Sequence, residues 1–270
     1  MAGGLPPLRR FGQHFLVDPN IQRKILACLD LSVRDVVLEI GPGDGALTRP
    51  VMERVRRVVA VEVDRGRAAA LQASLPKRCR TTVLCQDILK TDLKEIARRF
   101  RAGRIVVLGN IPYNITSAIL EFLCAASPIV KTAYLTVQKE VAGRLSAPPG
   151  TKAYGSLTCF VRHHFAVKAL FYIRPGSFRP APHVTSTFMR LTPLDRRRSG
   201  AKSEALLFQV IRTGFGQRRK RLAKALKALV PATLLSSANA AGFLGRRAEE
   251  LSLEEFTALS NLIFDIQFRR

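Results

Sequence analysis

The sequence predicts an α/β fold in which helices connect the strands of a mostly parallel sheet, followed by a small domain made only of helices. Two observations support this prediction. Between residues 36 and 137, short β-branched runs alternate with helical patterns, as they do in βαβ units. A polar and basic stretch, "LDRRRSGAKS" at 194–203, then precedes a region with helical patterns. We therefore expect a first domain over residues 1–194 and a helical second domain over residues 203–270.

The first domain begins with short apolar segments, a pattern typical of buried parallel strands. We expect strands at 36–40, 56–63, 81–87, 104–110 and 131–137. The connecting helices are expected to begin near residues 47, 66, 93 and 116. After Gly155 no strong helix is predicted, and we expect antiparallel strands that close the sheet edge. These later strands are expected at 156–165, 168–173 and 183–191.

The charge of the chain is its most unusual bulk property. The 270 residues carry a formal net charge of +24, and 47% of them are hydrophobic. This composition is typical of a globular protein, and the charge predicts an anionic partner, either nucleic acid or an acidic membrane surface. A solvated basic surface is the alternative. The apolar runs are too short to span a bilayer and "MAGGLPPLRR" lacks the apolar core of a signal peptide, so we expect no membrane partner.

The cysteines and histidines do not predict a metal centre. The five cysteines form no C-x-x-C pair, so we expect reduced, buried thiols in a cytoplasmic compartment. His14, His163, His164 and His183 show no spacing with the cysteines that is typical of zinc sites. We therefore assign no metal ligand.

A glycine-rich turn, "EIGPGDGALT" at 39–48, lies between the first expected strand and its helix. Gly41, Gly43 and Gly45 let a ligand approach the backbone closely, because no Cβ stands in the way. Their G-x-G-x-G spacing differs from the dinucleotide-binding pattern, and the absence of a P-loop sequence disfavours ATP. Taken alone, the turn is also consistent with a tight connection.

Acidic residues end the next two strands. Glu62 follows Gly41 by 21 positions, where an acid can accept hydrogen bonds from both ribose hydroxyls. Asp87, in "QDIL", can accept one from the exocyclic amine of adenine. Each acid alone is consistent with a solvated strand end. Together with the glycine turn they predict an adenosine ligand, because open α/β sheets bind ligands at the carboxyl ends of their strands.

The tetrapeptide "NIPY" ends the fourth strand at the same edge of the sheet. Pro112 fixes its own φ and drives Ile111 to an extended conformation, which directs the Ile111 carbonyl out of the strand. This carbonyl and the side-chain carbonyl of Asn110 form two acceptors for one amine, such as adenine N6, and so free the nitrogen lone pair from the ring. Tyr113 offers a face on which the base can stack. An ordinary Asn-Pro turn is the alternative.

Several stretches, taken in order, resemble the KsgA-type ribosomal RNA adenine dimethyltransferases. They are "FGQHFLVD" (11–18), "EIGPGDGALT", "VEVD", "QDIL", "GNIPYNITSAIL" and "FRPAPHVTSTFMRL". The resemblance implies a class I S-adenosylmethionine-dependent methyltransferase fold, a Rossmann-like fold with a seven-stranded, mostly parallel sheet, and a small all-helical C-terminal domain. Members of this family place two methyl groups on N6 of each of two adjacent adenines, in the loop of the 3′-terminal hairpin of small-subunit (16S-type) rRNA.

The resemblance also implies the residues of the site. S-adenosylmethionine is the expected cofactor. Its expected contacts are His14, Leu16, Gly41, Gly43, Glu62, Asp87, Ile88 and Asn110. The residues expected to hold the target adenine are Asn110, Ile111, Pro112 and Tyr113, with Phe178 as a second stacking partner. Relatives often carry Asn at the position of His14, although an imidazole can still donate a hydrogen bond.

The resemblance also implies the reaction, the partner and the compartment. The methyl group is expected to pass directly to N6 of an adenine swung out of its loop, with no covalent enzyme intermediate. The expected partner is small-subunit rRNA within a pre-30S-type particle. The protein is expected to act there as a cytoplasmic monomer in the biogenesis of the small ribosomal subunit.

Two alternatives stay open. An Erm-type methyltransferase modifies one adenine of large-subunit rRNA and confers antibiotic resistance. The stretches "KAYGSLTCFV" (152–161) and "GFGQRRKRLAKAL" (214–226) resemble KsgA-type segments instead. A non-catalytic assembly checkpoint or transcription factor on the same fold is the second alternative, and the intact glycine turn and "NIPY" argue against it.

A basic segment, "RTGFGQRRKRLAKALKAL" at 212–229, belongs to the expected helical domain. Leu222, Ala225, Leu226 and Leu229 follow the i, i+3, i+4, i+7 pattern, which predicts one apolar helix face. A solvated cationic face is one reading of the remaining side chains. We expect them instead to bind rRNA phosphates, which position an RNA without reading its sequence. The predicted RNA-binding residues are Arg218, Arg219, Lys220, Arg221 and Lys224.

Overall fold

The structure is a computed structural model, and it describes residues 14–195, 200–230 and 242–268. The chain forms two compact units. The first consists of Met1–Ala142 and Ala166–Pro193, and the second of Gly143–Phe165 and Leu194–Arg270. Each unit has buried hydrophobic side chains of its own.

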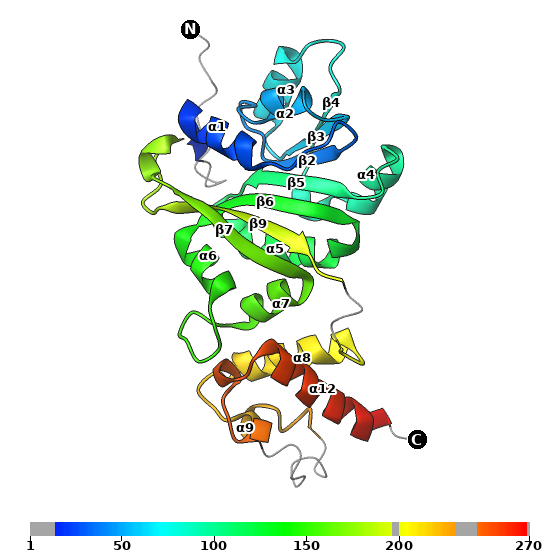
Figure 1. The fold of residues 1–270 in the computed structure, drawn as a ribbon, viewed down its shortest axis with the longest axis vertical. Coiled ribbons are helices and arrows are strands. Elements are labelled where there is room, and N and C mark those ends of the chain that lie inside the picture. Colours follow the sequence, from blue (N-terminus) through cyan, green and yellow to red (C-terminus); the bar gives the residue numbers. More distant parts are fainter. Residues whose placement is uncertain (1–13, 196–199, 231–241, 269–270) are drawn as a thin grey trace. The chain divides into compact units, whose positions relative to one another are not determined.

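The first unit is built on a seven-stranded sheet (Figure 1). Its strands are β2 (Val36–Ile40), β3 (Arg57–Glu62), β4 (Thr81–Cys85), β5 (Ile105–Asn110), β6 (Val130–Gln138), β7 (Phe165–Ile173) and β9 (Ser186–Pro193). Their order across the sheet is β4-β3-β2-β5-β6-β9-β7. The pairs β2–β3, β3–β4, β2–β5 and β5–β6 are parallel, and β6–β9 is antiparallel. The predicted mostly parallel sheet is therefore confirmed.

The strand order of the sheet reverses direction at β2. From β2 the chain moves outward to β3 and β4, and it then returns to β5 on the other side of β2. Such a reversal leaves a crevice at the carboxyl ends of the two central strands, which is where open α/β sheets bind ligands. Every residue of β2 is buried, as expected for a parallel strand that is covered on both faces.

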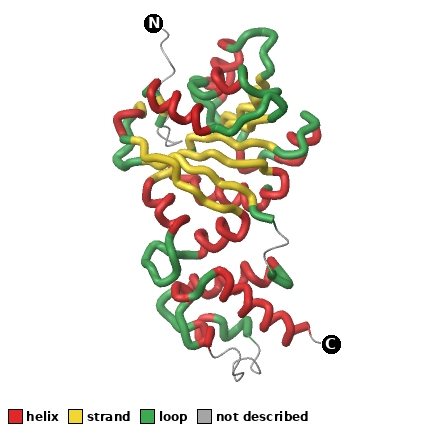
Figure 2. The backbone as a smooth tube through the Cα atoms, viewed as in Figure 1, coloured by secondary structure: helices red, strands yellow, loops and turns green. Residues whose placement is uncertain are grey.

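Helices flank the strands of the first unit (Figure 2). They are α1 (Pro19–Cys28), α2 (Thr48–Met52), α3 (Arg65–Ser74), α4 (Leu93–Arg99) and α5 (Thr116–Ala125), while α6 (Lys139–Ser146) ends in the second unit. The carboxylates of Asp18, Asp64 and Asp92 accept hydrogen bonds from backbone N–H groups at the starts of α1, α3 and α4. These caps satisfy donors that have no partner inside the helix.

A small second sheet holds the start of the described chain. In it, β1 (Phe15–Leu16) pairs with β8 (Phe178–Arg179) in antiparallel fashion. Beyond the pair, the N–H of Val17 donates to the carbonyl of Ser177 at 2.9 Å. These bonds fix the N-terminal segment against a loop that is more than 150 residues away in the sequence.

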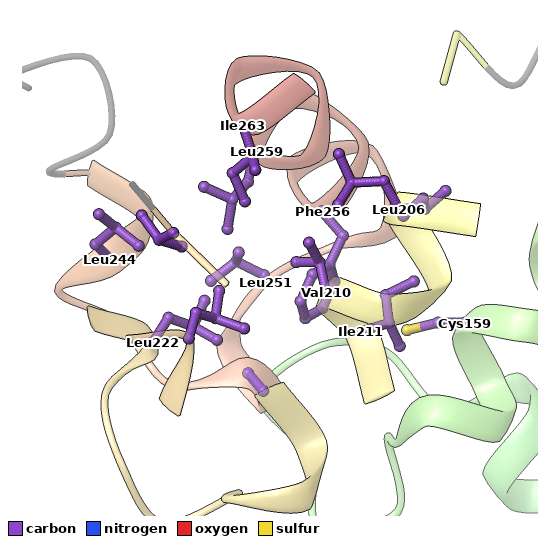
Figure 3. Close-up of a cluster of buried hydrophobic side chains, with 14 of the residues drawn as sticks. Cys159, Leu206, Val210, Ile211, Leu222, Leu244, Leu251, Phe256, Leu259 and Ile263 are labelled. Carbon is purple, nitrogen blue, oxygen red and sulfur yellow. The ribbon is translucent and has the colours of Figure 1, made fainter. Parts of the chain in front are cut away.

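The described part of the C-terminal region is helical, which confirms that prediction. The elements of the second unit are α7 (Ser156–His164), α8 (Glu204–Gly216), α9 (Leu222–Ala225), the 3-10 helix η7 (Ala248–Glu250) and α12 (Leu253–Phe268). Cys159 of α7, Leu222 of α9 and Phe256 of α12 are buried in one hydrophobic cluster with side chains of α8 (Figure 3). Helix α7 therefore shares its core with the C-terminal helices.

The strand expected at 156–165 is wrong, because residues 156–164 form α7. The Thr158 hydroxyl accepts a hydrogen bond from the Gly155 N–H at 3.2 Å and donates to the Arg144 carbonyl at 2.8 Å, which fixes the first turn of the helix. Cys159 and Phe160 are then buried in the cluster described above. Tertiary packing here overrides the β propensity of the segment.

The basic helix and the domain boundary of the C-terminal region differ in how they compare with the sequence prediction. The basic helix expected through Leu229 ends at Ala225, although Leu226 is fully buried as its spacing predicts. The domain boundary expected between residues 194 and 203 stays a prediction. The compact unit that contains the C-terminal helices also includes Gly143–Phe165.

All five cysteines are free. Cys124 and Cys159 are buried, Cys28 and Cys79 are partly exposed, and Cys85, which ends the edge strand β4, is exposed. The expectation of buried thiols is therefore confirmed for Cys124 and Cys159 only. None of the described helices combines the length and the apolar character needed to cross a bilayer. Within the described ranges, no group of three or more His, Cys, Asp or Glu side chains is placed to hold a metal ion.

Candidate active site

A pocket opens at the carboxyl ends of β2, β3, β4 and β5, in the crevice that the strand order predicts. Each of these strands contributes residues at or just after its last position, and the N-terminal segment contributes two more. The pocket brings together most of the predicted site residues. These are His14, Gly41, Glu62, Asp87, Ile88, Asn110, Ile111, Pro112 and Tyr113.

The glycine turn has the backbone conformation that its sequence predicts. Gly41, Gly43 and Gly45 have φ angles of +64°, +55° and +80°, which glycine adopts readily and other residues do not. A Cβ on Gly43 would lie 2.7 Å from the ring of Phe15. Gly43 does not line the pocket, and its N–H donates to Glu62 Oε2 at 3.2 Å. Gly43 thus acts on the pocket through Glu62, and its predicted contact with a cofactor stays a prediction.

Glu62 is the buried acid that lines the pocket, with 3% of its surface exposed. Its Oε1 accepts a hydrogen bond from the Asp64 N–H at 3.0 Å, and its Oε2 accepts the one from Gly43. Burial raises the pKa of Glu62, and these two hydrogen bonds oppose the rise. Because a carboxylate oxygen has two lone-pair sites, both oxygens can still accept a hydrogen bond from a ligand hydroxyl.

A second acid, Glu39, lies in β2 two residues before Gly41 and is 3% exposed. The Thr48 hydroxyl donates to Glu39 Oε2 at 2.6 Å. Burial raises the pKa of Glu39 to about 7; the Thr48 hydrogen bond opposes this rise and the nearby charge of Glu62 adds to it. No role was predicted for Glu39. The available signal was a single acid inside an otherwise apolar strand.

Phe15 and Arg67 were also missed. The ring of Phe15 lines the pocket, and the guanidinium of Arg67 lies over it, 3.9 Å from the ring centroid. Arg67 is 1% exposed, and its Nη1 pairs with Asp44 in the glycine turn at 2.6 Å. One buried arginine therefore connects the N-terminal segment to the glycine turn. A solvated helix position is the ordinary expectation for arginine, so the sequence alone gave no signal for this contact.

Asn110 is oriented by the N-terminal segment. Its Nδ2 donates to the carbonyl oxygen of His14 at 2.6 Å, which leaves Oδ1 as the side-chain atom that can accept a hydrogen bond in the pocket. The next residue, Ile111, donates its N–H to the Thr136 carbonyl at 3.1 Å. Pro112 follows with φ −57° and ψ 132°, in agreement with the constraint expected of proline. Both predicted acceptors thus belong to one pocket-lining turn.

Tyr113 is held from two sides. Its hydroxyl lies 2.8 Å from Ser186 Oγ, and the ring of His14 stacks on its ring with a centroid distance of 5.3 Å. His14 Nδ1 donates to the Pro180 carbonyl at 2.7 Å. Burial raises the pKa of Tyr113, so its hydroxyl stays neutral. His14 therefore contacts the "NIPY" turn through both its ring and its carbonyl.

Asp87 and Ile88 form the wall after β4. Asp87 Oδ1 accepts the Leu89 N–H at 2.9 Å, so Oδ2 is the oxygen that remains for a ligand amine. Ile88 is 5% exposed and lines the pocket with an apolar side chain. Asp87 can accept a hydrogen bond from the polar edge of a planar group, and Ile88 can pack against the apolar face of that group.

Leu16 and Phe178 lie outside the pocket. They face each other in the β1–β8 pair and are buried with side chains of α1. Phe178 is only 2% exposed, so in this conformation its ring offers no face to a base. The predicted stacking role of Phe178 therefore requires the ring to become exposed. That role and the predicted cofactor contact of Leu16 stay predictions.

Comparison with known proteins identifies the family. A family model described as "Ribosomal RNA adenine dimethylase" matches residues 8–264.

The chain belongs to this family. A ribosomal RNA small subunit methyltransferase A from Aromatoleum aromaticum is 39% identical over 260 residues, covering 94% of this chain and 93% of the relative. One from Clostridium botulinum is 37% identical, covering 96% and 94%. A solved dimethyladenosine transferase from Plasmodium falciparum has a TM-score of 0.79 at 25% identity, covering 94% and 98%. The 23S rRNA methyltransferase ErmE has a TM-score of 0.68 at 25% identity, covering 93% and 99%.

Membership of the rRNA adenine dimethylase family confirms three predictions. The fold is that of a class I S-adenosylmethionine-dependent methyltransferase with additional helices. The protein is an rRNA methyltransferase, and S-adenosylmethionine is its methyl donor. A purely non-catalytic role is therefore not supported.

The pocket fits the donor. Glu62 is a buried carboxylate, and hydrogen-bond donors such as the two ribose hydroxyls would offset the cost of its burial. Ile40, Val61 and Ile88 give the pocket apolar walls that suit the adenine ring. At Gly41 the space where a Cβ would stand is open. These residues would hold the adenosine part of S-adenosylmethionine.

The predicted RNA-binding residues lie in the second unit and differ in their surroundings. Arg218 Nε pairs with Glu249 Oε2 at 2.6 Å, and its Nη2 donates to the carbonyls of Thr151 and Lys152 at 3.1 and 2.8 Å. Any phosphate contact of Arg218 must therefore compete with contacts inside the unit. The four exposed members of the set are Arg219, Lys220, Arg221 and Lys224.

Proposed function

We propose that this chain places two methyl groups on N6 of each of two adjacent adenines, in the loop of the 3′-terminal hairpin of small-subunit rRNA. The observation that carries the proposal is the turn Asn110–Tyr113, which lines the cofactor pocket with the Asn110 amide already oriented by the His14 carbonyl. Curated relatives named as small-subunit methyltransferases support the choice of subunit.

The main task of the turn is to prepare the adenine amine. S-adenosylmethionine, when bound, supplies a methyl group on a positively charged sulfur. The lone pair of adenine N6 is delocalised into the ring and is therefore a poor nucleophile. For the first methyl group, Asn110 Oδ1 and the Ile111 carbonyl accept hydrogen bonds from the two N6–H groups, which favours a tetrahedral nitrogen with a free lone pair. For the second methyl group, one of these acceptors binds the N–H that remains. Acceptors held in place before the reaction act without reorganisation, and such fixed groups contribute strongly to catalysis.

Tyr113 and His14 position the base. The Tyr113 hydroxyl is fixed by Ser186, so its ring is a preformed surface for stacking. His14 already stacks on this ring, and a base that stacks on the same face must displace the imidazole. An adenine in an unpaired loop reaches the pocket at lower cost than a base-paired one, because fewer interactions are broken.

No nucleophile of the enzyme takes part in the proposed methyl transfer. None of the five free cysteines lines the pocket. Burial raises the pKa of the Cys124 thiol to about 12 and that of Cys159 to about 11, so both stay protonated at neutral pH. Catalysis by this chain is then mainly a matter of positioning.

The proposal also includes the substrate particle, the oligomeric state and the compartment of the protein. The substrate is small-subunit rRNA within a pre-30S-type particle, and the protein acts on it as a monomer in the cytoplasm. The free cysteines are consistent with a reducing compartment. The exposed cations Arg219, Lys220, Arg221 and Lys224 contact rRNA phosphates, for which the net charge of +24 is the supporting observation.

The test is to map the modified positions. Small ribosomal subunits that lack adenine dimethylation, and large subunits in parallel, are incubated with the purified chain and S-adenosylmethionine, and primer extension then locates blocked adenines. We expect two adjacent stops in the 3′-terminal hairpin of the small-subunit rRNA. Stops at one adenine of large-subunit rRNA would support the Erm-type activity instead, and would overturn the proposal.

A further inference from the structure

A second concave surface of the first unit is lined almost entirely by arginine. It lies at the amino ends of β3 and β4 and next to the C-terminal end of α4. Among the described residues, no acidic side chain lines it. We call this surface the arginine hollow. Its lining residues are Arg56, Arg57, Arg80, Arg99, Phe100 and Arg101.

Three of the five arginines of the hollow contact Phe100 rather than an acid. The guanidinium groups of Arg57 and Arg99 lie over the ring of Phe100, at 4.9 and 5.4 Å from its centroid. Arg56 donates to the Phe100 carbonyl oxygen. These contacts orient the cations without neutralising them. The nearby Arg98 is different, because it forms an ion pair with Glu95 on its own helix.

The helix end alone does not explain this concentration of charge. The partial negative charge at the C-terminus of α4 favours cations nearby, which accounts for Arg99 and Arg101. It does not account for Arg56 and Arg57 at the start of β3, or for Arg80 before β4. Like charges that converge from separate elements repel one another unless an anion binds between them.

Arg101 adds an independent observation. It directly follows the C-cap of α4, Phe100. With a φ of +50°, it is the one non-glycine residue with positive φ in the described part of the chain. The N–H of Ala102 donates to the Ala97 carbonyl at 2.8 Å, a bonding pattern in which the left-handed position is usually Gly or Asn. An arginine in this conformation is under backbone strain, which is often found at binding sites.

We propose that the arginine hollow binds phosphodiester groups of the rRNA substrate, as a contact surface separate from the catalytic pocket. Guanidinium groups pair with phosphate oxygens through two parallel hydrogen bonds, and the net charge of +24 agrees with a polyanionic partner. The choice of RNA as that partner rests on the rRNA substrate proposed above.

The hollow and the pocket contact different parts of the RNA. Arg57 begins β3 in the hollow and Glu62 ends β3 in the pocket. At about 3.3 Å per residue, their Cα atoms lie about 17 Å apart on opposite edges of the sheet. The adenine that enters the pocket therefore does not reach the hollow, and the hollow contacts another part of the RNA.

The test compares two substrates and two matched variants. The hollow variant carries Arg80→Gln and Arg101→Asn, because asparagine tolerates the left-handed conformation. The control variant carries Lys94→Gln and Arg98→Gln, which remove the same charge from exposed positions of α4 that do not line the hollow. Binding to small ribosomal subunits is measured over a salt series, methylation of a short hairpin that contains the target adenines is measured separately, and melting temperatures check folding.

We expect the slope of log binding constant against log salt concentration to become shallower in the hollow variant and to stay unchanged in the control variant. The expected decrease in slope is up to about 0.7–0.9 per lost phosphate contact. We also expect all three proteins to methylate the short hairpin at the same rate. Equal salt slopes for the two variants, or a loss of hairpin methylation in the hollow variant, would overturn the proposal. If the unmodified chain fails to methylate small-subunit rRNA, the proposed function fails instead, and the salt slopes still report on the hollow.

Discussion

At the scale of single residues, the role of Asn110 depends on what holds the other end of its amide. The sequence predicts Asn110 as an acceptor, but an amide can present either its oxygen or its nitrogen to a ligand. The hydrogen bond from Nδ2 to the His14 carbonyl, at 2.6 Å, decides this by fixing which end of the amide is the nitrogen, so that Oδ1 is the acceptor. The N-terminal segment is therefore part of the catalytic arrangement, although it lies about 96 positions away in the sequence.

We expect Asn110→Ala to lower the rate of methyl transfer by about 10²–10³, the loss typical of a removed preorganised polar group. Binding of S-adenosylmethionine should change only a few-fold, because Glu62 and the glycine turn remain in place. Single-turnover rates and calorimetric dissociation constants measure the two effects separately. A near-normal rate would show that Asn110 does not align the amine, and a large loss of donor binding would show that it mainly supports the pocket.

Glu39 gives a second prediction at this scale, about stability and pH. Its pKa is raised by burial from 4.5 to about 7, so the folded state retains a proton that the unfolded state releases. The contribution of Glu39 to the free energy of unfolding is therefore fully present below the pKa of the unfolded state. It is lost as the pH rises through the pKa of the folded state. The expected loss is on the order of 3 kcal/mol. Glu39→Gln can still accept the Thr48 hydrogen bond and cannot ionise.

Urea unfolding of both proteins at pH 5 and pH 8 measures this effect. Between these pH values, the free energy of unfolding of the unmodified chain should fall by about 2–3 kcal/mol more than that of Glu39→Gln. Parallel pH profiles would mean that Glu39 is ionised at no cost in the folded protein.

The residues that the sequence could not predict are those whose roles depend on burial. Phe15 belongs to a stretch that was recognised, yet its position between Gly43 and Arg67 follows only from the folded N-terminal segment. A fully buried arginine is uncommon, and nothing in the helix pattern of α3 distinguishes Arg67 from its solvated neighbours. By contrast, Gly41 and Glu62 were predictable, since their places at strand ends follow from the order of the strands.

At the scale of elements, the parallel strands were predicted well, because continuous apolar runs bounded by glycine and polar residues have few other interpretations. The expected strand at 36–40 coincides with β2 (Val36–Ile40). Helix α7 was predicted as a strand, because its sequence is rich in β-branched and aromatic residues whose burial requires helices distant in the sequence. Such tertiary effects are not visible in a local pattern.

Close packing of α8 gives a prediction at this scale. A Cβ on Gly214 would lie 3.0 Å from a methyl group of Leu222 and 3.3 Å from the Cβ of Ala248, whereas a Cβ on Gly216 would meet nothing within 4 Å. Both substitutions to alanine remove a flexible glycine from the helix, but only Gly214→Ala crowds its neighbours. We expect Gly214→Ala to be less stable than Gly216→Ala by about 1 kcal/mol or more.

Thermal or urea unfolding of the two alanine variants provides the comparison, with the unmodified chain as reference. Equal stabilities would show that α9 and η7 can move aside without loss, and that the close approach of α8 is not required.

At the scale of the whole molecule, the sequence correctly places a helical region after an α/β region, but the compact units do not follow that simple division. Gly143–Phe165 belongs to the unit that contains the C-terminal helices. The polar stretch at 194–203 was a visible signal, whereas the shared core of α7 and the C-terminal helices arises only on folding. The catalytic pocket, in contrast, lies within the first unit and follows from its strand order.

The central claim is that the donor binds where four parallel strands end, beside the "NIPY" turn. Amide hydrogen exchange of the full chain, with and without S-adenosylmethionine and in the absence of RNA, tests it most directly. We expect slower exchange on donor binding at 41–45, 62–64, 86–89 and 110–115, and unchanged exchange in α8 (Glu204–Gly216). Protection that is absent from these strand ends and present elsewhere would contradict the account.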